Sequence, residues 1–155
     1  MREAERLIKS FACATAGIIN TVMTQRNMRI HICAVVYVVL FGAMQRLDAV
    51  SWTIEIICCA AVIALELVNT AVENACNAVT HEIRSEIKMC KDASAGAVLV
   101  MAAASVLIWG LILVRGSGGV FLVNLKDAFV SGWGCAAAAV WLVLSFIFIF
   151  YRKKK

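Results

Sequence analysis

The stretch 93-ASAGAVLVMAAASVLIWGLILV-114 contains 22 consecutive residues without a charged side chain. A helix that crosses the hydrocarbon core of a bilayer needs about 20 such residues. A second uncharged stretch of 24 residues runs from Ala128 to Tyr151. Over all 155 residues the hydrophobic share is 63% and the mean hydropathy is +0.87, whereas soluble domains average about 45–50% apolar residues. The sequence therefore predicts an integral membrane protein.

Two weaker apolar segments precede these. Residues 30–44 are interrupted by His31, and residues 50–68 by Glu55 and Glu66. We expect an all-α fold with transmembrane helices over residues 29–47, 50–78, 92–114 and 128–151; the alternative is a soluble domain in which the first two segments form buried hairpins. In residues 2–24 the apolar side chains recur every three or four positions, which predicts an amphipathic helix on the membrane surface. Packing of that helix on other protein is a compatible alternative.

The distribution of Lys and Arg predicts the orientation. If the N-terminus is cytoplasmic, 12 of the 15 basic residues lie on the inner side. We therefore expect a multi-pass protein of the plasma membrane with both termini in the cytoplasm. The net charge of +5 then indicates an anionic membrane surface, and nothing in the sequence suggests nucleic-acid binding. The seven cysteines have no CxxC spacing and are expected to be small buried hydrophobic residues.

The stretch 64-ALELVNTAVENACNAV-79 carries an unusual polar face. At about 100° per residue, five polar side chains project within an arc of about 100°: Glu66, Asn69, Thr70, Glu73 and Asn77. Ionisable groups in a membrane segment cost roughly 2.5–3.5 kcal/mol and usually mark function. Polar contacts between helices would explain the amides, but two carboxylates call for a cation or a proton. With Lys91 nearby, this face suits a nucleotide phosphate and a divalent ion, although no P-loop motif occurs.

The motifs 66-ELVNTAVE-73 and 91-KDASAGAVL-99 resemble the prokaryotic diacylglycerol kinase and undecaprenol kinase family. The segments 6-RLIKSFACATAG-17 and 25-QRNMRIH-31 resemble the surface helix of that family and the residues that follow it. The resemblance covers about residues 5–114. It implies a membrane lipid-kinase domain over residues 1–114, and an extra transmembrane helix with a basic tail over residues 115–155.

The family consists of small membrane kinases, usually homotrimers, that move the γ-phosphate of MgATP onto a lipid hydroxyl at the cytoplasmic interface. By this resemblance Glu66 is the general base, Asn69 orients the reacting groups and Glu73 binds Mg²⁺. Ala95 lines the lipid site together with Glu66. The positions that resemble nucleotide contacts are Arg6, Cys13, Gln25, Glu73, Glu82, Arg84, Lys91 and Asp92.

The sequence departs from the family at several of these positions. Gln25 stands where a second metal-binding glutamate is usual, Asn77 replaces a common aspartate, Cys13 replaces an aromatic residue and Arg84 a histidine. We expect an active kinase, with undecaprenol as the first choice of substrate and diacylglycerol as the second. The alternatives are a weakened or inactive relative, a proton or cation pathway, and a structural subunit. Glu55 is read as an interfacial residue near the outer end of its helix, with a deeper polar role as the alternative.

Overall fold

The computed structural model describes residues 2–45, 47–79, 84–117 and 132–150. Between short connections, every part of these ranges is helical. The helices are α1 (Arg2–Thr24), α2 (Arg26–Met44), α3 (Ala49–Val79), α4 (Ser85–Ser117) and α6 (Gly132–Phe150). The part of the chain that the structure describes contains no strand, so the expected all-α fold is confirmed.

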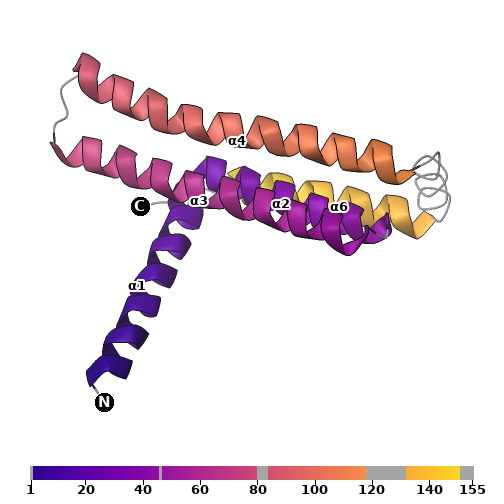
Figure 1. Cartoon of the computed structure of the whole chain (residues 1–155), viewed down its shortest axis with the longest axis horizontal. Coiled ribbons are helices and arrows are strands. Elements are labelled where there is room, and N and C mark those ends of the chain that lie inside the picture. Colours follow the sequence, from indigo (N-terminus) through magenta and orange to yellow (C-terminus); the bar gives the residue numbers. More distant parts are fainter. Residues whose placement is uncertain (1, 46, 80–83, 118–131, 151–155) are drawn as a thin grey trace.

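The helices form an elongated bundle with one arm (Figure 1). The helices α2, α3, α4 and α6 run along the long axis of the molecule, and α1 leaves them at a steep angle. The main packing is between α3 and α4; α2 packs on α3, and α6 packs on α2. The end of α1 meets α2 and α3, so the corner between α1 and α2 is anchored on the bundle.

Among the described residues, four helices are long and apolar enough to cross a membrane: α1, α2, α3 and α4. In α6 the described apolar helix is shorter, Val140–Phe150. Although α1 satisfies the same criterion, its first turns are charged, with Arg2, Glu3, Glu5, Arg6 and Lys9. Its steep angle to the bundle (Figure 1) suits a helix that lies along the membrane surface.

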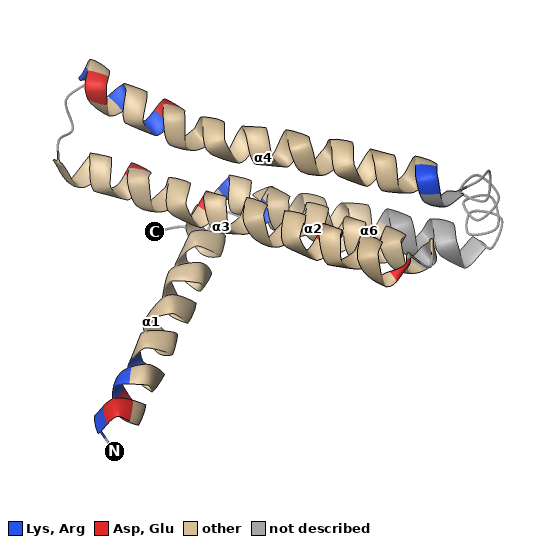
Figure 2. Ribbon diagram, viewed as in Figure 1, with Lys and Arg blue, Asp and Glu red and all other residues tan. Residues whose placement is uncertain are grey.

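Both α3 and α4 are longer than a membrane crossing. With 31 and 33 residues they measure about 46 and 50 Å, against about 30 Å for the hydrocarbon core. Their ends at residues 79 and 85, which we call the hairpin, project beyond the corner of α1 and α2 (Figure 1). The charged residues near the start of α4 lie on this projecting part, whereas Arg115 lies at the opposite end of α4 (Figure 2). The helix α4 begins seven residues before the expected membrane span at 92, because no proline or glycine interrupts residues 85–92.

The turn between α2 and α3 is short and tightly packed. Asp48 caps α3, since the Ser51 amide donates to Asp48 Oδ1 at 2.8 Å. This hydrogen bond holds the pKa of the Asp48 carboxyl below its usual value. Gly42 allows the two helices to approach, because a Cβ there would lie 2.8 Å from the ring of Trp52.

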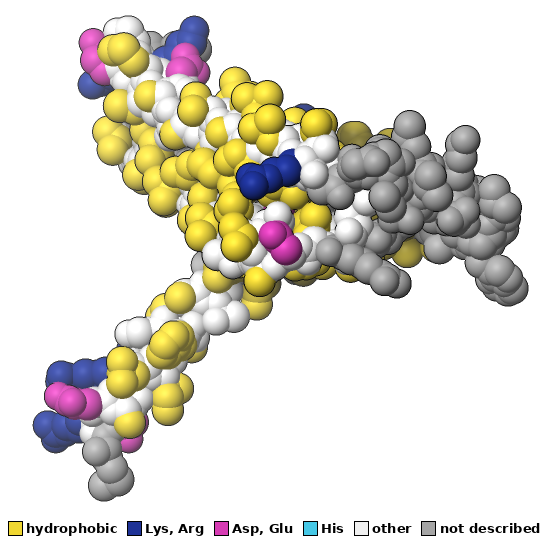
Figure 3. Space-filling view, turned by 45° about the vertical axis from the view of Figure 1, so that its right-hand side comes forward, with side chains coloured by type: hydrophobic (Ala, Val, Ile, Leu, Met, Phe, Trp, Pro, Cys, Tyr) yellow, Lys and Arg dark blue, Asp and Glu magenta, His cyan; other side chains and the backbone are white. Residues whose placement is uncertain are grey.

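The buried core is small and most large apolar side chains are exposed. The buried apolar residues are Met28, Cys33, Cys58, Val62 and Val98. Apolar side chains are spread over much of the visible described surface of the bundle and along α1, with charged side chains mainly near the ends of the helices (Figure 3), as expected for a protein whose solvent is lipid. The expectation that the cysteines are buried is wrong for Cys13 and Cys90, which are exposed, because they lie on α1 and on the projecting end of α4.

Candidate active site

The polar face of α3 runs from buried to exposed. The side chain of Glu66 is 2% exposed, and those of Asn69 and Thr70 are each 4% exposed. Glu73 is half-buried and Asn77 is exposed. The face expected from the sequence thus begins inside the bundle and ends on the projecting hairpin, so a ligand along it would meet both an apolar and a hydrated environment.

A cavity of about 260 Å³ surrounds the buried end of this face. It brings together three residues that the sequence singled out, Glu66, Asn69 and Ala95. Glu66 Oε2 is buried, and no hydrogen-bond partner for it lies among the described residues. A buried carboxyl oxygen without a partner is costly, so the cavity presents an acceptor that a hydroxyl ligand would satisfy.

Two hydrogen bonds connect α3 to α4 at the cavity and beyond it. The Ser94 hydroxyl lies 2.7 Å from Asn69 Oδ1 and 2.9 Å from the carbonyl oxygen of Lys91, and its single proton is shared between these two acceptors. Lys91 Nζ donates to Asn77 Oδ1 at 2.7 Å. Because the Asn77 amide is neutral, this bond orients the ammonium of Lys91 without neutralising it, and leaves a positive charge able to attract phosphate.

A second, larger hollow adjoins this cavity. It measures about 440 Å³, lies between α2, α3 and α4, and shares His31 and Ala102 with the cavity. We call it the apolar groove, because most of its lining side chains are apolar: Ala34, Val35, Val38, Phe41, Cys58, Cys59, Val62, Ala102, Val106 and Trp109, beside His31, Tyr37, Glu55 and Ser105. A hydrocarbon chain whose polar end is at Glu66 therefore has an apolar path into the bundle.

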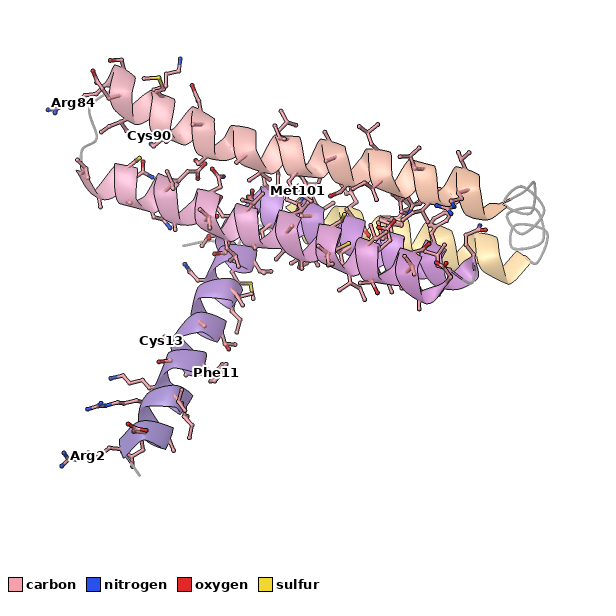
Figure 4. All side chains as sticks on the ribbon, viewed as in Figure 1. Arg2, Phe11, Cys13, Arg84, Cys90 and Met101 are labelled. Carbon is pink, nitrogen blue, oxygen red and sulfur yellow. The ribbon has the colours of Figure 1, made fainter. Side chains whose placement is uncertain are left out.

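The structure does not bring all of the predicted site residues together. Arg6 and Cys13 are exposed on α1, and Figure 4 places Cys13 far from Arg84 and Cys90 at the end of α4. Gln25 is half-buried at the corner between α1 and α2, in an extended conformation. Asp92 is exposed beside Lys91, and Glu82 lies outside the described residues.

Within the described ranges of one chain, no group of three or more His, Cys, Asp or Glu residues is placed to hold a metal ion. Magnesium does not need such a group, because it usually takes one or two carboxylates and completes its shell with phosphate oxygens and water. Glu73 on the hairpin and the Gln25 amide supply oxygens of the right kind.

Comparison with known proteins identifies the family. Residues 12–113 match the family described as prokaryotic diacylglycerol kinase. The chain belongs to this family. It is therefore a membrane lipid kinase by descent, and α6 lies outside the region that the family shares.

Two curated relatives give the family resemblance more detail. The chain is 37% identical over 112 residues to the undecaprenol kinase of Bacillus subtilis (strain 168). These aligned residues cover 72% of this chain and 91% of the relative. It is 36% identical over 112 residues to the diacylglycerol kinase of a Synechocystis species (strain ATCC 27184 / PCC 6803 / Kazusa), covering 72% of this chain and 64% of the relative. No solved structure matches the chain.

Sequence reasoning missed three polar residues at or beside the cavity. Asn27 and His31 of α2 line it, and Ser94 of α4 is hydrogen-bonded to Asn69, which also lines it. The signal for the first two was their spacing of four residues, which puts them on one helix face. Ser94 directly precedes Ala95, but only its partner on α3 reveals its role.

The burial of Glu55 between helices was not predicted from the sequence. Its side chain is only 3% exposed and lines the apolar groove, because it lies on the face of α3 that meets α2 and α4, whereas Ile54 and Ile56 beside it are exposed. Glu55 Oε1 is buried and has no hydrogen-bond partner in the described part of the chain.

Proposed function

We propose that this protein uses MgATP to phosphorylate the hydroxyl of a membrane lipid alcohol at the cytoplasmic interface, and that the lipid is undecaprenol. The observation that carries the proposal is the position of Glu66. Its carboxyl has a buried oxygen without a partner in the described structure, in a cavity that adjoins the apolar groove. About three turns further along α3 the side chains are exposed, and there Lys91 is bonded to Asn77.

In the proposed reaction Glu66 accepts the proton of the lipid hydroxyl, and the hydroxyl oxygen forms a bond to the γ-phosphorus of ATP. The bond between that phosphorus and the β–γ bridging oxygen breaks, and ADP leaves. Asn69, fixed by Ser94, orients the hydroxyl through its amide. General-base catalysis of this kind contributes about 10²- to 10⁴-fold.

The nucleotide is proposed to lie along the hydrated end of the hairpin. Lys91 contacts the phosphates and Asp92 the nucleoside side, with Arg84 just before the start of α4; by the family resemblance Glu82 would also contact the nucleotide. Glu73 and Gln25 hold Mg²⁺, which neutralises phosphate charge when it is bound. Since Gln25 contributes an amide where a carboxylate is usual in the family, the metal is held more weakly than in members with two glutamates.

The lipid hydrocarbon is proposed to enter the apolar groove. Most of its lining side chains are apolar, as a hydrocarbon chain requires. Of the two curated relatives described above, the one that is covered to 91% of its length is named undecaprenol kinase. This coverage supports undecaprenol over diacylglycerol.

A homotrimer in the plasma membrane is proposed to complete the nucleotide site. In one chain, Arg6 and Cys13 lie on an arm that points away from the hairpin (Figures 1 and 4). The arm also exposes apolar side chains such as Leu7, Ile8 and Phe11. A neighbouring copy would meet this arm, and with both termini in the cytoplasm the hairpin, the arm and ATP share one side of the membrane.

A proton or cation pathway is the rival function that the buried pair Glu55 and Glu66 supports. The two residues are eleven positions apart on one helix face, about 16 Å along its axis. However, the described part of α2 has no acidic residue, and those of α4, Glu86 and Asp92, lie on its projecting end. Within the bundle, α2 and α4 therefore add no described carboxyl group to a path between Glu55 and Glu66, so the kinase is favoured.

The proposal is tested by lipid phosphorylation with the purified full chain in mixed micelles. Undecaprenol and diacylglycerol are supplied separately with ATP, with Mg²⁺ or with EDTA. We expect phosphorylated undecaprenol that depends on Mg²⁺, with a lower kcat/KM for diacylglycerol. A preference for diacylglycerol would overturn the choice of lipid, and no transfer to either lipid at any Mg²⁺ concentration would overturn the kinase.

A further inference from the structure

We propose that α6 is an internal brace that fixes the wall of the lipid cavity through Arg29, which acts as a positioning residue. Arg29 lies in the first turn of α2 and is 6% exposed. Its Nε donates to the carbonyl oxygen of Ile149 in α6 at 3.1 Å. Its Nη1 donates to the carbonyl oxygens of Val22 at 3.1 Å and Met23 at 3.2 Å in α1. One guanidinium thus joins three helices.

Two of the three acceptors of Arg29 lie at a helix C-terminus, because Val22 and Met23 belong to the last turn of α1. The third acceptor, Ile149, lies near the end of the described part of α6. Carbonyl groups in a last turn have no partner within their own helix and carry partial negative charge. A planar guanidinium with several fixed donors can bond to the end of α1 and to α6 at once, whereas the single ammonium of a lysine does not have this geometry.

The rest of α6 docks on α2 in a consistent antiparallel register. Tyr37 and Trp141 pack edge to face with ring centroids 6.2 Å apart. Tyr37 is eight residues after Arg29, and Trp141 is eight residues before Ile149, so both contacts belong to one seam. Midway along it are two small buried residues, Cys33 and Ser145, each 6% exposed. Figure 1 shows the two helices side by side.

This seam lies directly behind the wall of the cavity. At about 100° per residue, Asn27 and His31 project about 160° and 200° from Arg29, and both line the cavity around Glu66. The contacts of Arg29 therefore set the rotation of the first turn of α2, and with it the position of Asn27 and His31. Gln25, which starts this turn, provides no side-chain cap, so the turn depends on Arg29.

Because α6 lies outside the shared family region, the brace belongs to this chain rather than to the common domain. Its kinetic consequence rests on the proposed function; its structural consequence does not. We expect a loosened brace to weaken binding of the lipid and to leave binding of ATP unchanged, since the cavity wall moves and the hairpin with Lys91 does not.

The test uses the full chain with Arg29→Gln, Arg29→Lys and Ser145→Phe. The last substitution forces α6 away from α2 without changing Arg29. Arg26→Gln, an exposed arginine in the same turn, and Val143→Phe, an exposed valine on α6, are the matched controls. Amide hydrogen exchange of residues 20–31 is measured by mass spectrometry, and KM for lipid and for ATP by kinetics.

All three test variants should exchange faster over residues 20–31, with residues 60–79 unchanged, and should raise KM for lipid by roughly three- to tenfold, the range expected from polar contacts of this class in membranes. KM for ATP and both controls should match the unsubstituted protein. If Arg29→Lys is normal, Arg29 acts as a point charge and the brace is refuted. Unchanged exchange in Ser145→Phe would refute the role of α6. Changed exchange in a protein without kinase activity would support the brace and reject the proposed function.

Discussion

The hydrogen bond between Ser94 and Asn69 gives the most quantitative prediction. Ser94→Ala removes the hydroxyl that lies 2.7 Å from Asn69 Oδ1. Asn69 is 4% exposed, so water does not replace the lost donor and the amide is free to rotate. If Asn69 orients the lipid hydroxyl, the reaction is slowed because the amide is no longer held in the reactive orientation.

The magnitude follows from the kind of bond that is lost. Couplings between polar side chains inside membrane proteins average about 0.6 kcal/mol and reach about 1.7 kcal/mol. A neutral hydrogen bond contributes about 0.5–1.5 kcal/mol. At about 1.4 kcal/mol per factor of ten, Ser94→Ala should lower kcat by roughly three- to twelvefold, with a smaller change in KM for ATP.

The assay is a double-mutant cycle of lipid phosphorylation with Ser94→Ala, Asn69→Ala and the double variant. Ser94→Thr is the control, because it keeps the hydroxyl. We expect Asn69→Ala to cost more than Ser94→Ala, and the double variant to resemble Asn69→Ala alone. Additive losses with a coupling under about 0.3 kcal/mol, or equal defects in Ser94→Ala and Ser94→Thr, would refute the reasoning.

Three further predictions concern the metal, the nucleotide and the fold. Gln25→Glu should lower the Mg²⁺ concentration for half-maximal activity several-fold, because a carboxylate adds charge to the oxygen ligands; an unchanged Mg²⁺ titration would remove Gln25 from the metal site. Lys91→Met should lower kcat/KM for ATP roughly ten- to hundredfold, as expected for charge-assisted bonds to phosphate. A rise in KM for lipid by the same factor would contradict this role. Asp48→Ala should lower the midpoint of thermal unfolding by about 2–4 °C because α3 loses its cap, while Asp48→Asn should not. The bond from Ser51 holds the pKa of Asp48 below its ordinary 3.8. The contribution of the ionised cap to stability is therefore present above pH 3.8 and is lost as the pH falls through the lowered pKa. A stability of the unsubstituted protein that does not change over this pH range would contradict the role of the ionised cap.

Much of the fold was predictable because it depends on local patterns. Uncharged stretches of membrane length predicted the helices, and a spacing of three and four residues predicted the polar face of α3. Glu66, Asn69 and Ala95 could be placed together because the first two share that face and Ala95 belongs to a motif that resembles the family. The projection of α4 to Ser85 was missed, since a hydropathy pattern reports the membrane and not the end of the helix.

The remaining features depend on contacts between distant residues. Arg29 bonds to the carbonyl of a residue 120 positions away, which a local pattern does not reveal. Glu55 resembled an interfacial residue because it lies near the start of α3, yet packing of α2 and α4 buries it. The separation of Arg6 and Cys13 from the hairpin likewise follows from the direction of α1 and not from its sequence.

The most direct test of the central claim compares the protein with its Glu66→Gln variant in phosphate transfer from labelled ATP to undecaprenol. Glu3→Gln, an exposed glutamate of α1, is the matched control. The account predicts that Glu66→Gln loses about 10²- to 10⁴-fold in kcat, the contribution of a general base, with intact folding and unchanged activity in the control. A Glu66→Gln variant with kcat within a few-fold of the unsubstituted protein would contradict it.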